Sequence, residues 1–376
     1  MLTFIIATAI KVVFFVVLFG LTLSAILTWM ERRQSAMMQD RLGPVRANIG
    51  KVRLWGLLHP LADALKLVVK EDFRPPHAYR ALYVLAPMLA LLPALLVFAV
   101  IPFGPPVCID QLGAALADVG GMCKPDQLHY LQIANLDIGL LFVFGIASLG
   151  VYGAVLAGWS SNNNYALLGG LRAAAQMLSY EVTMGMAVMG IFLVYGSLEP
   201  MSIVEQQSTM LDWGIVKQPL GFILFFFAAI AETKRAPFDI PEGESEIVGY
   251  FVEYSGTRFM VFYLGEFIEI VFVGTLITTL YLGGWQFPGL ASDGFHSFFG
   301  FNVNWLMPHW AVVALQMGAF VTKVFIVCFF QLAIRWTLPR LRYDQLMALG
   351  WKGLLPASIF NVVLTAAVML ALQSVK

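Results

Sequence analysis

Apolar residues in this chain are gathered into long continuous runs separated by shorter polar segments. Eight runs approach or exceed the roughly 20 residues that a helix needs to cross a bilayer. They do not alternate between apolar and polar positions, as the strands of a membrane β-barrel would. The pattern therefore predicts one all-α integral membrane domain over residues 1–376, with eight transmembrane helices. These runs are residues 2–30, 81–103, 133–159, 167–195, 215–233, 249–283, 308–335 and 353–374.

The segment Leu54–Lys70 is also rich in apolar residues, but it is too short and too charged to span. Leucine and valine recur there at helical spacing, while His59, Asp63 and Lys66 lie elsewhere around the helical wheel. This arrangement predicts an amphipathic helix that lies at the membrane interface. Two roles fit the pattern about equally well: a surface tether, and a lid over a lipid-soluble substrate.

Composition and charge agree with a membrane protein and orient it. Hydrophobic residues make up 59% of the chain and charged residues 12%, against about 45–50% and 25% in soluble domains. With eight spans, 17 of the 23 Lys and Arg residues fall on one face, ten of them in residues 31–80. The opposite loops and end carry only Lys124, Lys217 and Lys376. The positive-inside rule predicts structured basic loops in the cytoplasm and both termini on the periplasmic side.

Several ionisable residues lie inside the apolar runs, where a charge costs at least about 2.5–3.5 kcal/mol. Glu181 lies about 14 residues into the fourth run, and Lys323 lies near the middle of the seventh. Either they form structural contacts between helices or they belong to a proton path. The sixth run is longer than a bilayer requires, so we expect its first turns to project into the cytoplasmic side. Its ionisable residues are Glu253, Arg258, Glu266 and Glu269.

The segment before the sixth run is acidic, and its residues 234–248 are predicted to form a cytoplasmic loop. Two prolines and a glycine prevent a continuous helix there. A solvated acidic loop is one interpretation. The other is a cluster of carboxylates that raise one another's pKa and change protonation near neutral pH. The five carboxylates are Glu232, Asp239, Glu242, Glu244 and Glu246.

Four separate motifs occur in an order that is specific when taken together. They are Glu31-Arg32-Arg33 with Arg41-Leu42-Gly43-Pro44, the run Pro60-Leu61-Ala62-Asp63-Ala64-Leu65-Lys66-Leu67, Leu171-Arg172-Ala173-Ala174-Ala175-Gln176-Met177 with Ser179-Tyr180-Glu181, and the acidic loop followed by Val252-Glu253-Tyr254-Ser255-Gly256. The chain resembles the quinone-site membrane subunit of complex I, the proton-translocating NADH:quinone oxidoreductase. In bacteria this is the H subunit, and its mitochondrial counterpart is subunit 1.

The resemblance implies a subunit of an oxidoreductase that is not catalytic alone and binds no cofactor itself. It would form most of the tunnel that admits quinone, the substrate, from the bacterial inner membrane. The headgroup would be reduced beyond this chain, and flavin and iron–sulfur clusters would belong to partner subunits. The implied partners are peripheral-arm subunits with the headgroup site and the terminal iron–sulfur cluster, small and antiporter-like membrane subunits, lipid and quinone, but no nucleic acid.

The resemblance also assigns roles to particular residues. The tunnel wall falls on Arg32, Arg41, Asp63 and Lys66. Quinone reduction demands protons, which carboxylates of raised pKa can supply. The glutamate-rich proton path toward the pumping subunits falls on Glu181, Glu232, Asp239, Glu242, Glu244, Glu246 and Glu253. A structural or proton-path role falls on Arg258, Glu266 and Lys323.

The three cysteines, Cys108, Cys123 and Cys328, include no CxxC pair. They are too few for an iron–sulfur cluster, which usually takes four thiolates, so we expect no metal centre. Cys108 and Cys123 either form a disulfide, if their face is oxidising, or remain free thiols.

Two other functions would also place charges in a helical bundle. An ion-coupled secondary transporter usually shows internal repeats with paired broken helices, and the sequence has no convincing repeat. The membrane subunit of an energy-converting hydrogenase would keep the carboxylates but lose the amphipathic segment around Asp63. A quinone-tunnel subunit agrees both with the lack of a convincing internal repeat and with the amphipathic segment around Asp63.

Overall fold

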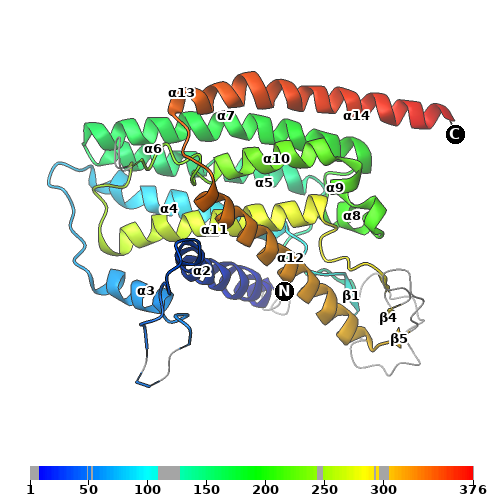
Figure 1. Ribbon diagram of the computed structural model, residues 1–376, viewed down its shortest axis with the longest axis horizontal. Helices are drawn as coiled ribbons and strands as arrows, with labels where there is room; N and C mark the ends of the chain where they lie inside the picture. Colours follow the sequence, from blue (N-terminus) through cyan, green and yellow to red (C-terminus); the bar gives the residue numbers. More distant parts are fainter. Residues whose placement is uncertain are drawn as a thin grey trace.

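The computed structural model describes residues 8–48, 50–51, 54–108, 128–243, 249–291, 294–295 and 305–375. These residues form a helical bundle with a few two-residue strands (Figure 1). The helices are a π-helix (Val13–Leu21), α2 (Thr22–Met38), α3 (His59–Val69), α4 (Arg80–Leu96), a 3-10 turn (Val97–Val100), α5 (Gly139–Ala147), α6 (Gly150–Ser160), α7 (Asn164–Tyr195), α8 (Pro200–Glu205), a 3-10 turn (Met210–Asp212), α9 (Gly214–Lys217), α10 (Pro219–Glu232), α11 (Gly256–Tyr281), α12 (His309–Thr337), α13 (Tyr343–Ala348), a second π-helix (Leu349–Leu354) and α14 (Leu355–Val375).

The short strands lie in the segments that connect the long helices. Strand β1 (Val107–Cys108) pairs antiparallel with β2 (Leu128–His129). Strand β4 (Gly294–Phe295) lies between β3 (Leu290–Ala291) and β5 (Trp305–Leu306), with both pairings antiparallel. These pairs are too short to form a sheet core, so the architecture remains helical.

Seven continuous helical segments are long and apolar enough to cross a membrane within the described residues, which confirms the predicted all-α membrane fold. The expected fifth span, residues 215–233, is instead divided into α9 and α10. Pro219 starts α10 because proline suits the first turn of a helix but cannot continue one. The 14 residues of α10 cover about 21 Å, less than the roughly 30 Å hydrocarbon core. The membrane fold thus contains seven long helices and one short one among the residues described.

Helix α11 lies at the centre of the bundle and α14 at its edge. Buried residues make up 72% of the most apolar 18 residues of α11, but only 17% of those in the last span. Helix α11 packs against α2, α3, α4 and α12, whereas α14 packs mainly on α7. In Figure 1, α7 and α14 run along one edge, α12 crosses the bundle, and α3 lies near α2 at the opposite edge. Residues of α11 can therefore contact side chains from most of the chain.

Several helix ends differ from the predicted ones; the last span, for example, begins at Tyr343 instead of residue 353. The first span extends to Met38 instead of ending near residue 30, since Glu31 and Gln34 are buried by packing against other helices. The sixth begins at Gly256 instead of residue 249, because Ser255 is extended and Gly256 has a φ of +57°. Glycine adopts this left-handed conformation without steric cost. The prediction that Glu253 lies on this helix is therefore wrong, and Glu253 precedes it.

Close approach of α4 and α6 depends on Gly153. A β-carbon at this position would lie 2.7 Å from the backbone nitrogen of Ala90, closer than real atoms approach. A β-carbon on Gly145 of α5, in contrast, would meet nothing within 4 Å. Small residues of this kind allow membrane helices to pack backbone to backbone.

We predict that Gly153→Ala lowers the thermal unfolding temperature of the purified complex by a few degrees. Overpacking of this kind costs about 1–3 kcal/mol, which exceeds the gain of roughly 1 kcal/mol in helix propensity. Gly145→Ala is the matched control and should leave the unfolding temperature unchanged or raise it. Equal unfolding temperatures for the two variants would contradict the close α4–α6 contact.

Candidate functional site

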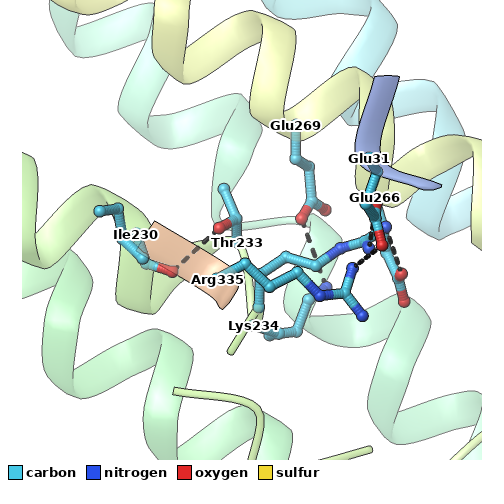
Figure 2. A network of polar contacts seen from close by, with 8 residues as sticks. Glu31, Ile230, Thr233, Lys234, Glu266, Glu269 and Arg335 are labelled. Carbon is cyan, nitrogen blue, oxygen red and sulfur yellow. Dashed lines mark hydrogen bonds and ion pairs between the residues drawn. The ribbon is translucent and has the colours of Figure 1, made fainter. Parts of the chain in front are cut away.

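The buried charges of the protein are centred on Arg235, in the loop after α10. Arg235 is only 7% exposed. Its Nη1 donates to Glu31 Oε2 at 3.3 Å, and its Nη2 lies 3.2 Å from Glu266 Oε2. Arg335 of α12 donates to the other carboxylate oxygen of Glu31 (Figure 2). Two arginine side chains thus connect α2, α11, α12 and the loop through charge-assisted contacts.

The loop that carries Arg235 is held in place by α7. The Nε2 of Gln176 donates to the carbonyl oxygens of Ala231 and Phe238, both at 2.7 Å. Because Gln176 is fully buried, these bonds form away from competing water. A further bond at 3.2 Å joins the backbone nitrogen of Leu341 to the carbonyl of Pro237. The loop is therefore fixed to both α7 and the segment before α13.

A second buried ion pair lies beside the first. Lys234 is 4% exposed, and its Nζ lies 3.5 Å from Glu269 Oε2 (Figure 2). Burial lowers the pKa of Lys234, but the carboxylates of Glu269 and Glu266 outweigh burial, so the net pKa is raised. Arg235 also lies over the Phe267 ring, 4.3 Å from its centroid. Both cations therefore remain charged inside the protein.

The acidic loop places two carboxyl groups with raised pKa beside these cations. Burial raises the pKa of Asp239 to about 6, although Arg340 and Arg335 oppose the shift. Burial, and next the charge of Glu266, raise the pKa of Glu242 well above its usual value. Glu242 Oε1 has no hydrogen-bond partner among the residues that the structure describes. Asp239 can therefore gain or lose a proton near neutral pH, while Glu242 favours its protonated form more than an exposed glutamate does.

Glu232 extends the charged region into the bundle. Its carboxylate interacts electrostatically with Glu181 of α7 and Glu269 of α11. A cavity of about 40 Å³ is lined by Glu232, Thr233 and Glu269 together with apolar side chains of α4, α5, α7 and α11. This volume is enough for an ordered water, which needs about 10–15 Å³ and polar partners. The structure therefore groups Glu181 and Glu232 with the cluster around Arg235.

Charged residues of α2 and α3 form a second, adjoining group. Asp63 Oδ2 lies 2.6 Å from Arg32 Nη1, and Asp63 Oδ1 lies 3.2 Å from Lys66 Nζ. No α3 residue is buried, and Leu61 and Leu65 are more than half exposed. An open cavity of about 550 Å³ adjoins this group. Its walls include Glu31, Arg32, Arg41, Pro44 and Trp336.

Lys323 lies outside both groups. Its ammonium donates to three backbone carbonyls just after α11, at 2.6, 3.0 and 2.7 Å, and lies 4.4 Å from the centroid of the Trp213 ring. Among the described residues it forms no ion pair with Glu181. The accepting carbonyls belong to Leu282, Gly284 and Gln286. These contacts favour the structural role over the proton-path role.

Arg258 and Glu253 also lie apart from the central cluster. Arg258 Nε is 3.4 Å from Asp72 Oδ2. Glu253 accepts a bond of 2.7 Å from Asn163 Nδ2, and its backbone carbonyl accepts one of 2.7 Å from the Tyr83 hydroxyl. These contacts join the segment before α11 to α4 and to the start of α7.

Some predictions lie outside the described residues. These include the path positions Glu244 and Glu246 and the alternatives for Cys108 and Cys123, whose side chains are not described. Cys328 is described and is a buried free thiol. Within the described part of the chain, no group of three or more His, Cys, Asp or Glu residues is arranged to hold a metal ion.

Sequence reasoning missed the residues at the centre of the cluster. Glu31, Arg235 and Arg335 received no site role, and Glu269 was noted only as an embedded charge. Glu31 and Arg335 lie just beyond the predicted end of the first run and at the end of the seventh, where charged residues usually face water. Glu31 had a further signal, because it begins one of the four motifs, whereas Arg335 only adjoins a long apolar run, as many solvated residues do.

Comparison with known proteins identifies related chains. The model of the family described as NADH dehydrogenase matches residues 10–366. The H subunit of NADH-quinone oxidoreductase that is numbered 2 in Geobacter sulfurreducens is 44% identical over 96% of this chain and 95% of its own length. The H subunits numbered 1 in Geobacter metallireducens and 2 in Koribacter versatilis are 44% and 42% identical, each over 96% of this chain and 95% and 97% of their own lengths.

We predict that Arg235→Gln destabilises the protein strongly, because removing one member of a buried ion pair costs about 3–5 kcal/mol. The unpaired carboxylate of Glu266 is the main cause, since Glu31 retains Arg335. The double variant Arg235→Gln with Glu266→Gln should therefore recover stability. The yield of assembled complex and its unfolding temperature measure the effect.

Arg342→Gln is the control, since the Arg342–Asp344 pair is 78% and 71% exposed. Exposed pairs contribute little to stability. An Arg235→Gln complex as stable as this control would refute the importance of the central cluster.

Proposed function

Because this chain belongs to the NADH dehydrogenase family, and its relatives are named as the H subunit of NADH-quinone oxidoreductase, we propose that it forms the quinone access tunnel of such a complex. We also propose that its buried carboxylates begin the proton or charge path that links quinone reduction to pumping. The chain is thus a multi-pass membrane subunit of an oxidoreductase. Flavin and iron–sulfur clusters would be held by partner subunits of the peripheral arm.

The observation that carries this proposal is the continuity of buried charge from an open cavity into the bundle. Glu31 lines the 550 Å³ cavity and contacts Arg235. Arg235 contacts Glu266, whose charge acts on Glu242. A charge change at the cavity is therefore felt through adjacent groups, since the low dielectric of the interior strengthens each interaction.

The path continues through the second ion pair. Lys234 contacts Glu269, and Glu269 lines the same small cavity as Glu232, which interacts with Glu181. Glu181 lies on α7, toward the edge of this chain. We infer that the path leaves the subunit there toward the small and antiporter-like membrane subunits.

The tunnel proposal rests on α3 and the cavity beside it. Asp63 anchors α3 to Arg32, while the exposed leucines of α3 can face lipid. A quinone has a long apolar tail and a polar headgroup, so apolar residues beside charged ones suit its passage. Arg32 and Arg41 at the cavity would meet the polar headgroup, while the headgroup is reduced in the peripheral arm.

The chemistry assigned to this chain is protonation and charge response. Asp239, whose pKa burial raises to about 6, lies beside the central cluster and titrates near neutral pH. Adding negative charge to a quinone nearby would raise this pKa further and favour proton uptake. The basic loops would face the cytoplasm and both termini the periplasm. The family match favours this function over a transporter or a hydrogenase subunit.

We predict that Glu242→Gln lowers quinone-dependent turnover about tenfold or more, in line with the loss of a general acid–base group. Reduction of an artificial acceptor by the peripheral arm should stay unchanged, since it bypasses the membrane subunit. Asp344→Asn makes the same chemical change at an exposed carboxylate and serves as the control. If Glu242→Gln complexes turn over quinone as fast as this control, the path does not include Glu242.

We also predict that Ala62→Trp, at an exposed position of α3, raises the apparent KM several-fold for a long-tailed quinone. The indole would narrow the route of the tail, so the KM for a short-tailed quinone should change much less. Ala371→Trp, at an exposed position of α14, is the matched control. Normal kinetics of Ala62→Trp with long-tailed quinone would exclude a tunnel beside α3.

A further inference from the structure

A large cavity lies away from the charged site, at the end of the bundle where α7 and α14 finish. Its volume is about 490 Å³, within the roughly 300–1,000 Å³ of small-ligand sites. It opens between α7, α10 and α14; Figure 1 shows the ends of α7 and α14 on the side of the molecule where the C-terminus lies. Apolar side chains form most of its wall. They include Val194, Leu220, Leu364, Val368 and Leu372.

The cavity lies beside the start of α10 and the last turns of α7. Helix α7 has 32 residues and covers about 48 Å, whereas α10 has 14 residues and covers about 21 Å. Gln176 of α7 contacts Ala231 near the end of α10, and Gly190 lies against Gln218 at its start, so α7 extends only a few residues past Pro219 on the cavity side. The described residues leave a space between α7 and α14 beside Pro219. In a bilayer an apolar space of this kind is filled either by lipid or by another protein helix.

The polar groups at the cavity indicate that its occupant is an amphiphilic lipid and not an apolar protein helix. Lys217 lines the cavity, forms an ion pair with Asp212 at 2.9 Å and lies 5.3 Å from the centroid of the Tyr195 ring. Lysine and tyrosine are typical of the level of the lipid headgroups. The side chains of Lys217 and Asp212 are 35% and 38% exposed. The ammonium can therefore donate a further hydrogen bond, and the carboxylate can accept one. Together they offer one positive and one negative charge.

The buried polar side chains of the cavity are hydrogen-bonded to one another, so they are not available to bind a ligand. Gln218 Nε2 donates to Thr365 Oγ1 at 2.7 Å, and Asn361 Nδ2 donates to Gln218 Oε1 at 3.2 Å. Thr365 Oγ1 donates to the Asn361 carbonyl at 2.7 Å. These bonds join α14 to the start of α10 and use the polar groups internally. The remaining wall suits a hydrocarbon chain.

We propose that this cavity binds one zwitterionic phospholipid of the leaflet nearer the C-terminus, with its phosphate on Lys217 and its headgroup amine at Asp212. One acyl chain fills the apolar space between α7 and α14. A headgroup of zero net charge matches the Lys217–Asp212 pair, whereas an anionic headgroup would leave Asp212 facing like charge. The acyl chain covers the apolar wall that α7, α10 and α14 form there. This site is independent of the quinone function.

Filling the cavity tests the proposal directly. In the whole complex purified in mild detergent, Val368→Trp should remove one tightly bound phosphatidylethanolamine per complex, counted by native mass spectrometry. Val363→Trp is the matched control, because Val363 is exposed on the same helix but does not line the cavity. Equal lipid counts in both variants and the wild-type complex would overturn the proposal.

Headgroup selectivity gives a second, milder test. After delipidation, we expect the complex to retain phosphatidylethanolamine in preference to phosphatidylglycerol. Lys217→Gln should lower this retention about tenfold, as expected for loss of a hydrogen bond from a charged donor. Retention that is equal for both lipids and unchanged by Lys217→Gln would contradict the phosphate contact.

A photoreactive phenylalanine derivative at Val368 distinguishes the two possible occupants. Cross-linking to phospholipid supports the proposal. Cross-linking to another protein of the complex would show that a protein helix fills the cavity and would overturn the lipid assignment.

Discussion

The buried fork of Arg235 between Glu31 and Glu266 is the interaction on which the rest of the site depends. A buried arginine is costly to desolvate, and only a close, well-oriented set of carboxylates offsets that cost. Here the carboxylates come from α2 and α11, while Arg335 of α12 shares Glu31. The relative placement of three helices and one loop is thus coupled to a single electrostatic condition.

This condition explains why the acidic loop is not simply solvated. Gln176 holds both ends of the segment from Ala231 to Phe238 against α7, so its charged residues are carried into the interior. Once there, Asp239 and Glu242 lose water and their pKa values rise, while Lys234 and Arg235 keep their charge beside carboxylates. Proton affinity and local structure then depend on the same contacts, as a redox-linked response requires.

Helix α10 connects the charged cluster to the opposite end of the bundle. The short α10 begins at Pro219, and its C-terminal end delivers Glu232 and the Arg235 loop to α11. An apolar space lies beside the start of α10, next to α14, which belongs to the least buried span among the described residues. The same helix, α10, therefore borders the cavity at its start and positions the charged residues at its end.

The helical membrane class followed from the amino-acid sequence alone, because long apolar runs have few other stable structures in a bilayer. The sequence also located the acidic loop and α3, since charge and helical spacing are local properties. Which charged residues contact one another became clear from the three-dimensional structure, because Glu31 and Arg235 are 204 positions apart in the chain. Lys323 donates to backbone carbonyls, which a pattern of side chains cannot predict. The start of α11 at Gly256 and the shortness of α10 likewise depend on backbone conformation and packing, which apolar content does not encode.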